Sequence, residues 1–391
     1  MVTLNKGTAK DVLDNPKKIR EIDAGGMIDV VLKSGRMIRD AYALGKEVEV
    51  PETVRVGSKI INYREMPKGI VVCGMGGSGI VGKLLSAWLG EELSIPIFTV
   101  TDYTLPKFVG EGYLVIVVSY SGNTEETICS MYIAAKRGSM IFGVTSNGAI
   151  ERFCREAKFP FVKIPSGFQP RVALPYLLVS IIPVLESVNI LKESKESEIT
   201  SASLLVEELS EKVSPEVPVD DNLCKRIALG IYSTIPLIYG YRILEPVAYR
   251  MKCQLNENAK MMAFSHIFPE MNHNEIVGWM SGKEHPFSVV LIRDCERFEP
   301  PEIKARIEIC KRLFFENAAI SVNEIFATGE KIAERLFSSI FLVDMISVYV
   351  AVARGVDPTP VDPITSLKHE LEEWRFKEKF INEMSKLISR G

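Results

Sequence analysis

The chain has 391 residues, of which 47% are apolar and 25% are charged, and its formal net charge is −3. This length suggests two domains, and the composition is ordinary for a globular protein. Nucleic-acid-binding proteins usually carry a basic excess, so the charge argues against that class of function.

Seven cysteines are scattered along the sequence, and none of them forms a C-x-x-C pair. We therefore predict reduced, buried thiols in a cytoplasmic protein. A zinc site would need clustered Cys and His, so we expect no metal. The N-terminus lacks the apolar core of a signal peptide. We also expect no membrane span, because the longest apolar stretch, Val172 to Val188, is interrupted by two prolines and falls short of about 20 residues.

Residues 1–52 are expected to form a helical N-terminal extension that packs on the main domain. Apolar residues recur at helical spacing from Met27 to Leu44, and Asp14-Asn15-Pro16 is a plausible helix start. Pro51 closes the segment.

The next segment, 53–200, alternates short apolar strands with helices. Strands are expected at 69–73, 95–101, 114–118, 140–145 and 161–164, with helices at 80–89 and 124–136. This alternation predicts a parallel sheet that helices cover on both faces.

A polar stretch, 189–221, marks the domain boundary, and we expect a linker helix within 201–221 that ends before Pro215. A second alternation then fills 222–391. Strands are expected at 235–239, 287–293 and 319–326, helices at 246–263, 298–315 and 330–352, and a C-terminal helix at 364–388. The predicted fold class is α/β, with two doubly wound parallel-sheet domains of three αβα layers in tandem.

The expected strand Val115 to Val118 ends in S-Y-S-G-N-T-E-E-T, where a helix begins. Ser119, Ser121 and Thr124 would thus lie with free backbone N–H groups at a helix N-terminus, which favours binding of an anion such as phosphate. The alternative is a cluster of N-cap residues, although one hydroxyl would suffice for that.

The strand before it ends in G-M-G-G-S-G, which brings Gly77 and Ser78 to the same edge of the sheet. Its spacing differs from the dinucleotide-binding G-x-G-x-x-G, and the P-loop Lys-Ser/Thr pair is absent. Two such turns in one sheet favour a sugar phosphate or a similar monoester.

Three charged or titratable side chains could carry chemistry. Arg171 stands next to a proline in an apolar segment, where it could stabilise developing negative charge or simply be solvated at a helix start. Glu257 in N-E-N-A-K and His273 in P-E-M-N-H-N-E make a plausible acid–base pair. The alternatives are an exposed helix carboxylate and a surface or helix-cap histidine.

Together these motifs resemble the SIS (sugar isomerase) domain family, and specifically the bifunctional phosphoglucose/phosphomannose isomerases found mainly in archaea. The resemblance rests on C-G-M-G-G-S-G, V-S-Y-S-G-N-T-E-E-T, and L-N-E-N-A-K with P-E-M-N-H-N-E-I-V-G-W, and it spans roughly residue 65 to the C-terminus. S-x-S-G-x-T alone marks only the SIS fold, whereas the last pair of motifs is much more specific. The long N-terminal region and the 189–221 stretch depart from the shorter members.

The resemblance implies an aldose–ketose isomerase that interconverts glucose 6-phosphate and mannose 6-phosphate with fructose 6-phosphate through an enediolate, at a site between two SIS domains. Residues of the two turns would bind the substrate's phosphate: Gly77, Ser78, Ser119, Ser121 and Thr124. Arg171 would stabilise the enediolate, and Glu257 would move a proton between C1 and C2. This chemistry needs no metal or redox cofactor.

The resemblance further implies a homodimer in which His273 comes from the partner subunit and assists ring opening, with Lys368 near the ring oxygen. Tolerance of both epimers would require a rotation about C2–C3, for which Thr359 and Thr365 are candidate residues. Two alternatives stay open: a SIS-domain isomerase of another phosphosugar, and a non-catalytic sugar-phosphate-binding regulator.

Overall fold

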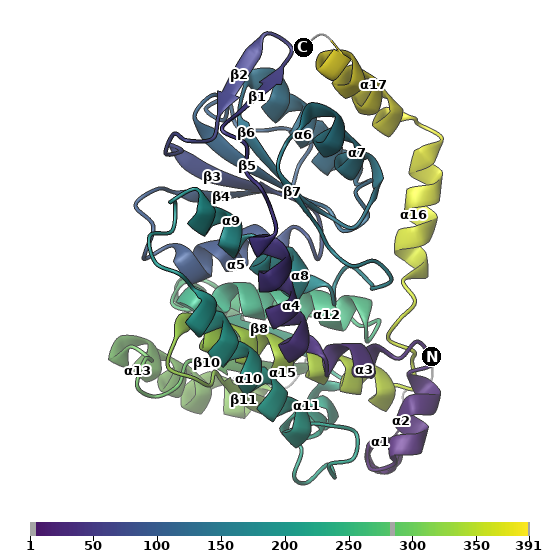
Figure 1. Cartoon of the computed structure of the whole chain (residues 1–391). Helices are drawn as coiled ribbons and strands as arrows, with labels where there is room; N and C mark the ends of the chain where they lie inside the picture. The colour runs from purple at the N-terminus through teal and green to yellow at the C-terminus, as the bar shows by residue number, and fades with distance from the viewer. Residues whose placement is uncertain (1–4, 282–285, 390–391) are drawn as a thin grey trace. The chain divides into compact units, whose positions relative to one another are not determined.

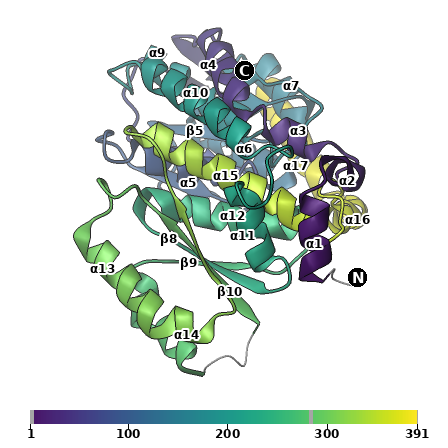
Figure 2. The same ribbon diagram turned by 90° about the horizontal axis from the view of Figure 1, so that it is seen from below.

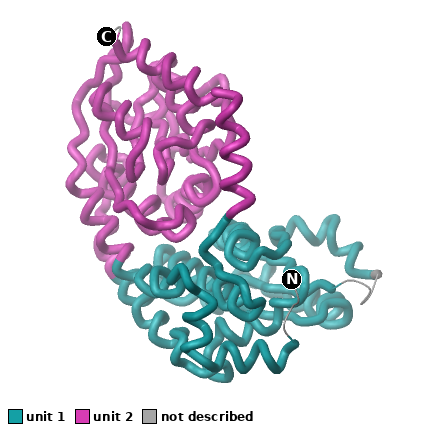
Figure 3. Tube along the Cα trace, turned by 90° about the vertical axis from the view of Figure 1, so that its right-hand side faces the viewer, with its two compact units in different colours: residues 1–36, 201–361 teal, residues 37–200, 362–391 magenta. Residues whose placement is uncertain are grey.

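The computed structural model describes residues 5–281 and 286–389. The chain divides into two compact units, each made of segments that are far apart in the sequence (Figure 3). Unit 1 comprises Met1–Arg36 and Ser201–Val361, and unit 2 comprises Met37–Thr200 and Asp362–Gly391. The sequence predicts four consecutive domains instead, and those domain bounds stay a prediction.

Unit 2 is built around a five-stranded sheet in which all neighbouring strands are parallel, in the order β4-β3-β5-β6-β7 (Figure 1). Its strands are β3 (Gly69–Cys73), β4 (Ile97–Val100), β5 (Tyr113–Val118), β6 (Met140–Thr145) and β7 (Phe161–Lys163). The three middle strands are buried almost throughout, as their continuous apolar runs require. All five lie where the sequence predicts strands.

Helices cover this sheet, and a small antiparallel hairpin stands beside it. The elements are the hairpin strands β1 (Thr53–Val56) and β2 (Lys59–Asn62) and the helices α4 (Ser34–Lys46), α5 (Ile80–Leu89), α6 (Glu125–Arg137), α7 (Gly148–Ala157), α8 (Leu174–Val179), α9 (Ile182–Ser187), α16 (Asp362–Glu372) and α17 (Phe376–Ser389). α17 packs on α6 and α7. The strand order reverses between β3 and β5, which makes their carboxyl ends the crevice where such sheets bind ligands.

Unit 1 contains a four-stranded parallel sheet in the order β11-β10-β8-β9. Its strands are β8 (Ile235–Gly240), β9 (Phe264–Ile267), β10 (Phe287–Arg293) and β11 (Val322–Phe326). α11 (Leu223–Ile231), α12 (Glu245–Glu257) and α15 (Ile332–Ala353) lie on one face, and α13 (Pro301–Cys310) and α14 (Glu316–Ala318) lie on the other (Figure 2). The predicted α/β class with two parallel sheets is therefore confirmed.

The remaining helices of the chain are short, apart from α10, which crosses the expected boundary near residue 200. They are α1 (Lys6–Leu13), α2 (Pro16–Ile22), α3 (Met27–Val31) and α10 (Glu196–Lys212), the 3-10 helices η1 (Arg242–Leu244), η2 (Glu270–His273) and η3 (Glu275–Ser281), and the π-helical turn η4 (Lys311–Phe315). The helical start predicted at Asn15 is confirmed, since its side chain accepts hydrogen bonds from the N–H groups of Lys17 and Lys18.

α15 corrects one expectation, because Val172 to Val188 is not the longest apolar stretch. Among the described helices α15 has the length and composition to cross a membrane, with a mean hydropathy of 2.1 over its most apolar window. That window is wholly buried within unit 1, however, so α15 is the core helix of this unit. The single acid in this window, Asp344, pairs with Arg250 of α12.

Three element ends differ from the expectation. α12 ends at Glu257 rather than near residue 263, because the chain reverses at Lys260 and continues as β9. The expected helix 298–315 is α13 followed by the π-helical η4. The expected single C-terminal helix is two helices, and Arg375 between them has a positive φ of 54°.

Candidate active site

The two glycine- and serine-rich turns of unit 2 meet at the reversal of the strand order. They follow β3 and β5, which pair directly, so the structure brings Gly77 and Ser78 beside Ser119. The backbone N–H of Tyr120 donates to Ser78 Oγ at 3.3 Å. This part of the predicted phosphate site is therefore a single cluster.

The hydroxyls of this cluster do not cap the helix that follows them. Thr124 is the N-cap residue of α6, yet its side chain makes no capping hydrogen bond. Its Oγ1 lies 2.9 Å from Ser119 Oγ instead, and Ser121 is exposed. The first N–H groups of α6 thus have no hydroxyl partner among the described residues. The N-cap alternative is wrong, and these donors suit an anion.

The turn after β6 supports the turn after β5, a role that was not predicted from the sequence. Gly122 has a φ of 65°, and a Cβ there would lie 1.7 Å from the carbonyl oxygen of Asn147. Thr145 Oγ1 donates to that same carbonyl at 2.8 Å, and Ser146 Oγ donates to the carbonyl of Tyr120 at 2.6 Å. The signal was present in the sequence as T-S-N-G, a hydroxyl and glycine turn directly after a strand.

Arg171 is buried against the first of these turns. Its side chain is only 2% exposed, so the alternative of a solvated arginine is wrong. A Cβ on Gly77 would lie 3.0 Å from the Arg171 Cα, which shows how closely the two backbones approach. The hydroxyl of Tyr120 accepts a hydrogen bond from the N–H of Phe168 at 2.7 Å, and burial raises the pKa of that tyrosine. The structure thus brings the backbone of the buried Arg171 together with the first phosphate turn.

Glu257 is the last residue of α12 in unit 1 and is half-buried. A buried ion pair orients this helix, since Arg250 Nη2 lies 2.6 Å from Asp344 Oδ2 of α15. The following residue, Asn258, is fully buried and donates to Ser347 Oγ at 2.9 Å. Contacts on both sides therefore hold the backbone that carries the Glu257 carboxylate.

His273 ends η2 and is exposed. Glu275, two residues further, anchors this segment to the sheet: it accepts a hydrogen bond from the Tyr239 hydroxyl of β8, and its Oε2 lies 2.8 Å from His266 Nδ1 of β9. Burial, followed by the Glu275 carboxylate, raises the pKa of Tyr239 well above its usual range. Glu275 stands in the P-E-M-N-H-N-E motif, but its role was not predicted from the sequence.

The predicted site residues thus fall into groups. The turn residues and Arg171 cluster in unit 2, and Lys368 lies exposed on α16 of the same unit. Glu257 and His273 belong to unit 1, on segments that both pack on β9. Thr359, also in unit 1, packs closely against Gly25 of the N-terminal segment.

A cavity of about 660 Å³ in unit 1 is lined by His266 and Glu275 but by none of the predicted site residues. It lies beside Tyr239, whereas the next residue, Gly240, faces Ala248 of α12, so the cavity is on the other face of the sheet. No group of three or more His, Cys, Asp or Glu side chains that could hold a metal occurs within residues 5–281 and 286–389.

Comparison with protein families gives two matches. A model of the SIS domain matches residues 66–158, and a model described as the bacterial phospho-glucose isomerase C-terminal SIS domain matches residues 220–371. The first covers the phosphate turns, and the second covers Glu257, His273 and Lys368.

Similar proteins span most of the chain. A bifunctional phosphoglucose/phosphomannose isomerase of Caldicellulosiruptor bescii is 35% identical over 89% of this chain and 99% of its own length. A protein of the same name from Aquifex aeolicus is 36% identical over 78% of this chain and 91% of its own length. A solved structure of a hypothetical protein from Thermus thermophilus has a TM-score of 0.67 at 14% identity, covering 95% of this chain and 96% of that one, which shows a shared fold.

Proposed function

Because the chain belongs to the bifunctional phosphoglucose/phosphomannose isomerase family, we propose that it interconverts glucose 6-phosphate and mannose 6-phosphate with fructose 6-phosphate. The observation that carries this proposal is the crevice of unit 2. Its glycines, hydroxyls and uncapped helix N-terminus suit a phosphate monoester, and a buried arginine, Arg171, packs its backbone against the first turn.

In this proposal the enzyme binds its substrate through the phosphate group. The phosphate is bound by residues of the two turns: Gly77, Ser78, Ser119, Ser121 and Thr124. The reaction is a proton transfer, in which Glu257 removes the proton from C2 of the open-chain aldose and the electron pair forms the enediolate. The proton then returns to C1 while the hydroxyl proton of O2 passes to O1, which gives the ketose with no net gain or loss of electrons. Arg171 balances the negative charge that develops on the enediolate oxygen.

Ring opening precedes this step and needs an acid near the ring oxygen. We assign this role to His273 of a partner subunit in a homodimer, assisted by Lys368. Two observations support the dimer: His273 is exposed in the single chain, and α16, which carries Lys368, buries none of its side chains. We place the enzyme in the cytoplasm, where phosphorylated sugars are metabolised.

The test is Glu257→Gln, assayed with glucose 6-phosphate and mannose 6-phosphate side by side. Loss of the base should lower kcat by about 10²–10⁴-fold for both substrates while binding of the sugar phosphate persists. Glu245→Gln is the matched control, since it removes a half-exposed carboxylate from the first turn of the same helix.

Each result decides between the hypotheses. An active Glu257→Gln enzyme contradicts the assignment of the base. A wild-type protein that binds both sugar phosphates and isomerises neither is a regulator, and activity only on a different phosphosugar identifies another isomerase.

A further inference from the structure

The ammonium group of Lys260 lies in a ring of backbone carbonyl oxygens. Its Nζ donates to the carbonyls of Glu257 at 2.9 Å and Asn258 at 3.1 Å, where α12 ends. It also donates to the carbonyls of Asp357 and Pro358, both at 2.9 Å, which stand 97 and 98 positions later in the chain. One side chain thus joins the end of the Glu257 helix to a distant turn of the same unit.

The backbone of Lys260 is itself held in an uncommon conformation. Its φ is 51°, in the left-handed region that side chains other than glycine rarely adopt. This reversal folds the lysine back over the last turn of α12, where helix carbonyls have no partner of their own and favour a cation. The half-buried Lys260 side chain therefore provides hydrogen-bond donors for carbonyl groups at the end of the helix.

Neighbouring contacts hold the same short segment. Asn256 Nδ2 donates to the carbonyl of Met261 at 2.8 Å, and Arg354 Nε donates to the carbonyl of Ala259 at 3.1 Å. These two bonds fix the chain on either side of Lys260 but leave the carbonyl of Glu257 to the ammonium. The ammonium of Lys260 therefore reaches the backbone of Glu257 directly, which neither of these two bonds does.

We propose that Lys260 is a positioning residue for the reaction, because it clamps the backbone of Glu257 to the Asp357–Pro358 turn and so fixes the direction of the carboxylate. This inference rests on the proposed role of Glu257 as the base. Proton transfer demands closely defined geometry, and a misplacement of about 1 Å can cost about 10²-fold in rate.

The test is Lys260→Met, which keeps the length and the apolar stem but removes the charge and the donors. We expect kcat to fall by about 10–100-fold. The KM should change by less than about threefold, since the residues that bind the phosphate in our proposal belong to unit 2.

The fraction of an isotope label that is transferred from C2 to C1 gives a measurement that a loss of stability does not change. With glucose 6-phosphate deuterated at C2, a well-placed base carries part of the label to C1 of fructose 6-phosphate and loses the rest to water. A carboxylate that is displaced or more open to water should lower the transferred fraction in Lys260→Met, per folded enzyme.

Lys225→Met is the matched control. Lys225 is fully buried in the same unit, and its Nζ also donates to backbone carbonyls, those of Pro215 at 2.8 Å and Val217 at 2.7 Å. No described contact joins it to the Glu257 segment. This variant should lose thermal stability but keep the wild-type kcat and label transfer in its folded fraction.

The outcomes separate the two proposals. An inactive Glu257→Gln enzyme together with an unchanged Lys260→Met enzyme overturns the positioning role alone, whereas an active Glu257→Gln enzyme overturns the base itself. Equal effects of Lys260→Met and Lys225→Met on kcat and label transfer also overturn the positioning role. If Lys260→Met does not fold, Lys260→Arg carries the same expectation, because a planar guanidinium cannot direct its donors at the same four carbonyls.

Discussion

The two parallel sheets of this chain reverse their strand order at equivalent places, but we propose that only the crevice of unit 2 is open to a ligand. In unit 2 the crevice between β3 and β5 is lined by glycines and small hydroxyl residues. In unit 1 the corresponding place, between β8 and β10, is filled by Tyr241 and Asp294. The hydroxyl of Tyr241 accepts the N–H of Asp294 at 3.2 Å, and Arg335 Nη1 lies 2.5 Å from Asp294 Oδ2.

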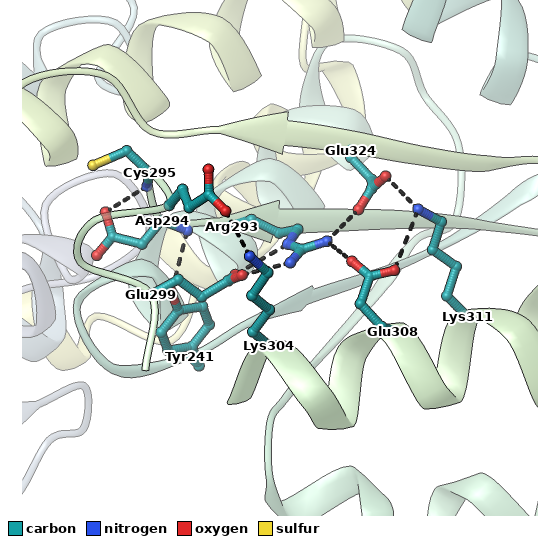
Figure 4. A network of polar contacts seen from close by, with 10 residues as sticks. Tyr241, Arg293, Asp294, Cys295, Glu299, Lys304, Glu308, Lys311 and Glu324 are labelled. Carbon is teal, nitrogen blue, oxygen red and sulfur yellow. Dashed lines mark hydrogen bonds and ion pairs between the residues drawn. The ribbon is translucent and has the colours of Figure 1, made fainter. Parts of the chain in front are cut away.

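A larger ionic network stiffens this closed end of unit 1 (Figure 4). The guanidinium of Arg293, the last residue of β10, pairs with Glu299, with Glu308 of α13 and with Glu324 of β11, and Lys311 pairs with Glu324 at 2.7 Å. Under this proposal the topology offers a binding crevice twice, and the side chains determine which of the two binds a ligand. Unit 1 uses its own carboxylates and guanidinium groups where unit 2 leaves donors for an external anion.

The largest effect should come from adding a methyl group in the open crevice. Gly122→Ala would place a Cβ 1.7 Å from the carbonyl oxygen of Asn147 at a φ of 65°. Backbone must move, so we expect a loss of more than about 4 kcal/mol of unfolding free energy together with sugar-phosphate binding. Chemical denaturation and calorimetric titration measure these two quantities.

Gly76→Ala is the control for that change. Gly76 also has a positive φ, 54°, but a Cβ there meets nothing within 4 Å. Only the conformational cost of about 1–2 kcal/mol should remain. Similar losses for the two variants would show that the close approach to Asn147 is not what holds the turn.

The next effect concerns the closed crevice. Asp294→Ala leaves Arg335 buried without its carboxylate, and removing one partner of a buried pair costs about 3–5 kcal/mol. In the folded fraction the KM for sugar phosphates should stay at the wild-type value. Asp220→Ala, which breaks an exposed pair with Lys10, should cost less than about 1 kcal/mol. A raised KM in Asp294→Ala would mean that unit 1 contributes to phosphate binding.

The smallest effect on stability, and the clearest on function, is expected at Ser121. The residue is exposed, so Ser121→Ala should change the unfolding free energy by less than about 0.5 kcal/mol. The KM should nevertheless rise, because the hydroxyl binds phosphate in the ground state and the transition state alike. Ser187→Ala, at an exposed serine of α9, should change neither quantity. A wild-type KM in Ser121→Ala would place the phosphate elsewhere.

Much of the fold could be predicted because buried parallel strands are continuous apolar runs that end in glycine or hydroxyl residues. This pattern located all five strands of the parallel sheet in unit 2. It missed β9, since F-S-H-I is a short edge strand whose Phe264 is 49% exposed and whose sequence continues an apolar helical pattern. Edge strands bury too few side chains to require a continuous apolar run in the sequence.

The candidate site, too, could be predicted only in part. By itself the sequence determined the glycine- and hydroxyl-rich turns that we propose bind phosphate, because local spacing after a strand specifies both the backbone path and the hydroxyls, and its motifs indicated the family. Only the tertiary structure decided that Thr124 leaves the α6 N-terminus uncapped, that Asp294 and Arg335 close the second crevice, and that Lys260 reaches the carbonyl of Pro358. Each of these contacts joins groups that are brought together in space only when the chain folds. Residue type and local spacing in the sequence do not specify such distances.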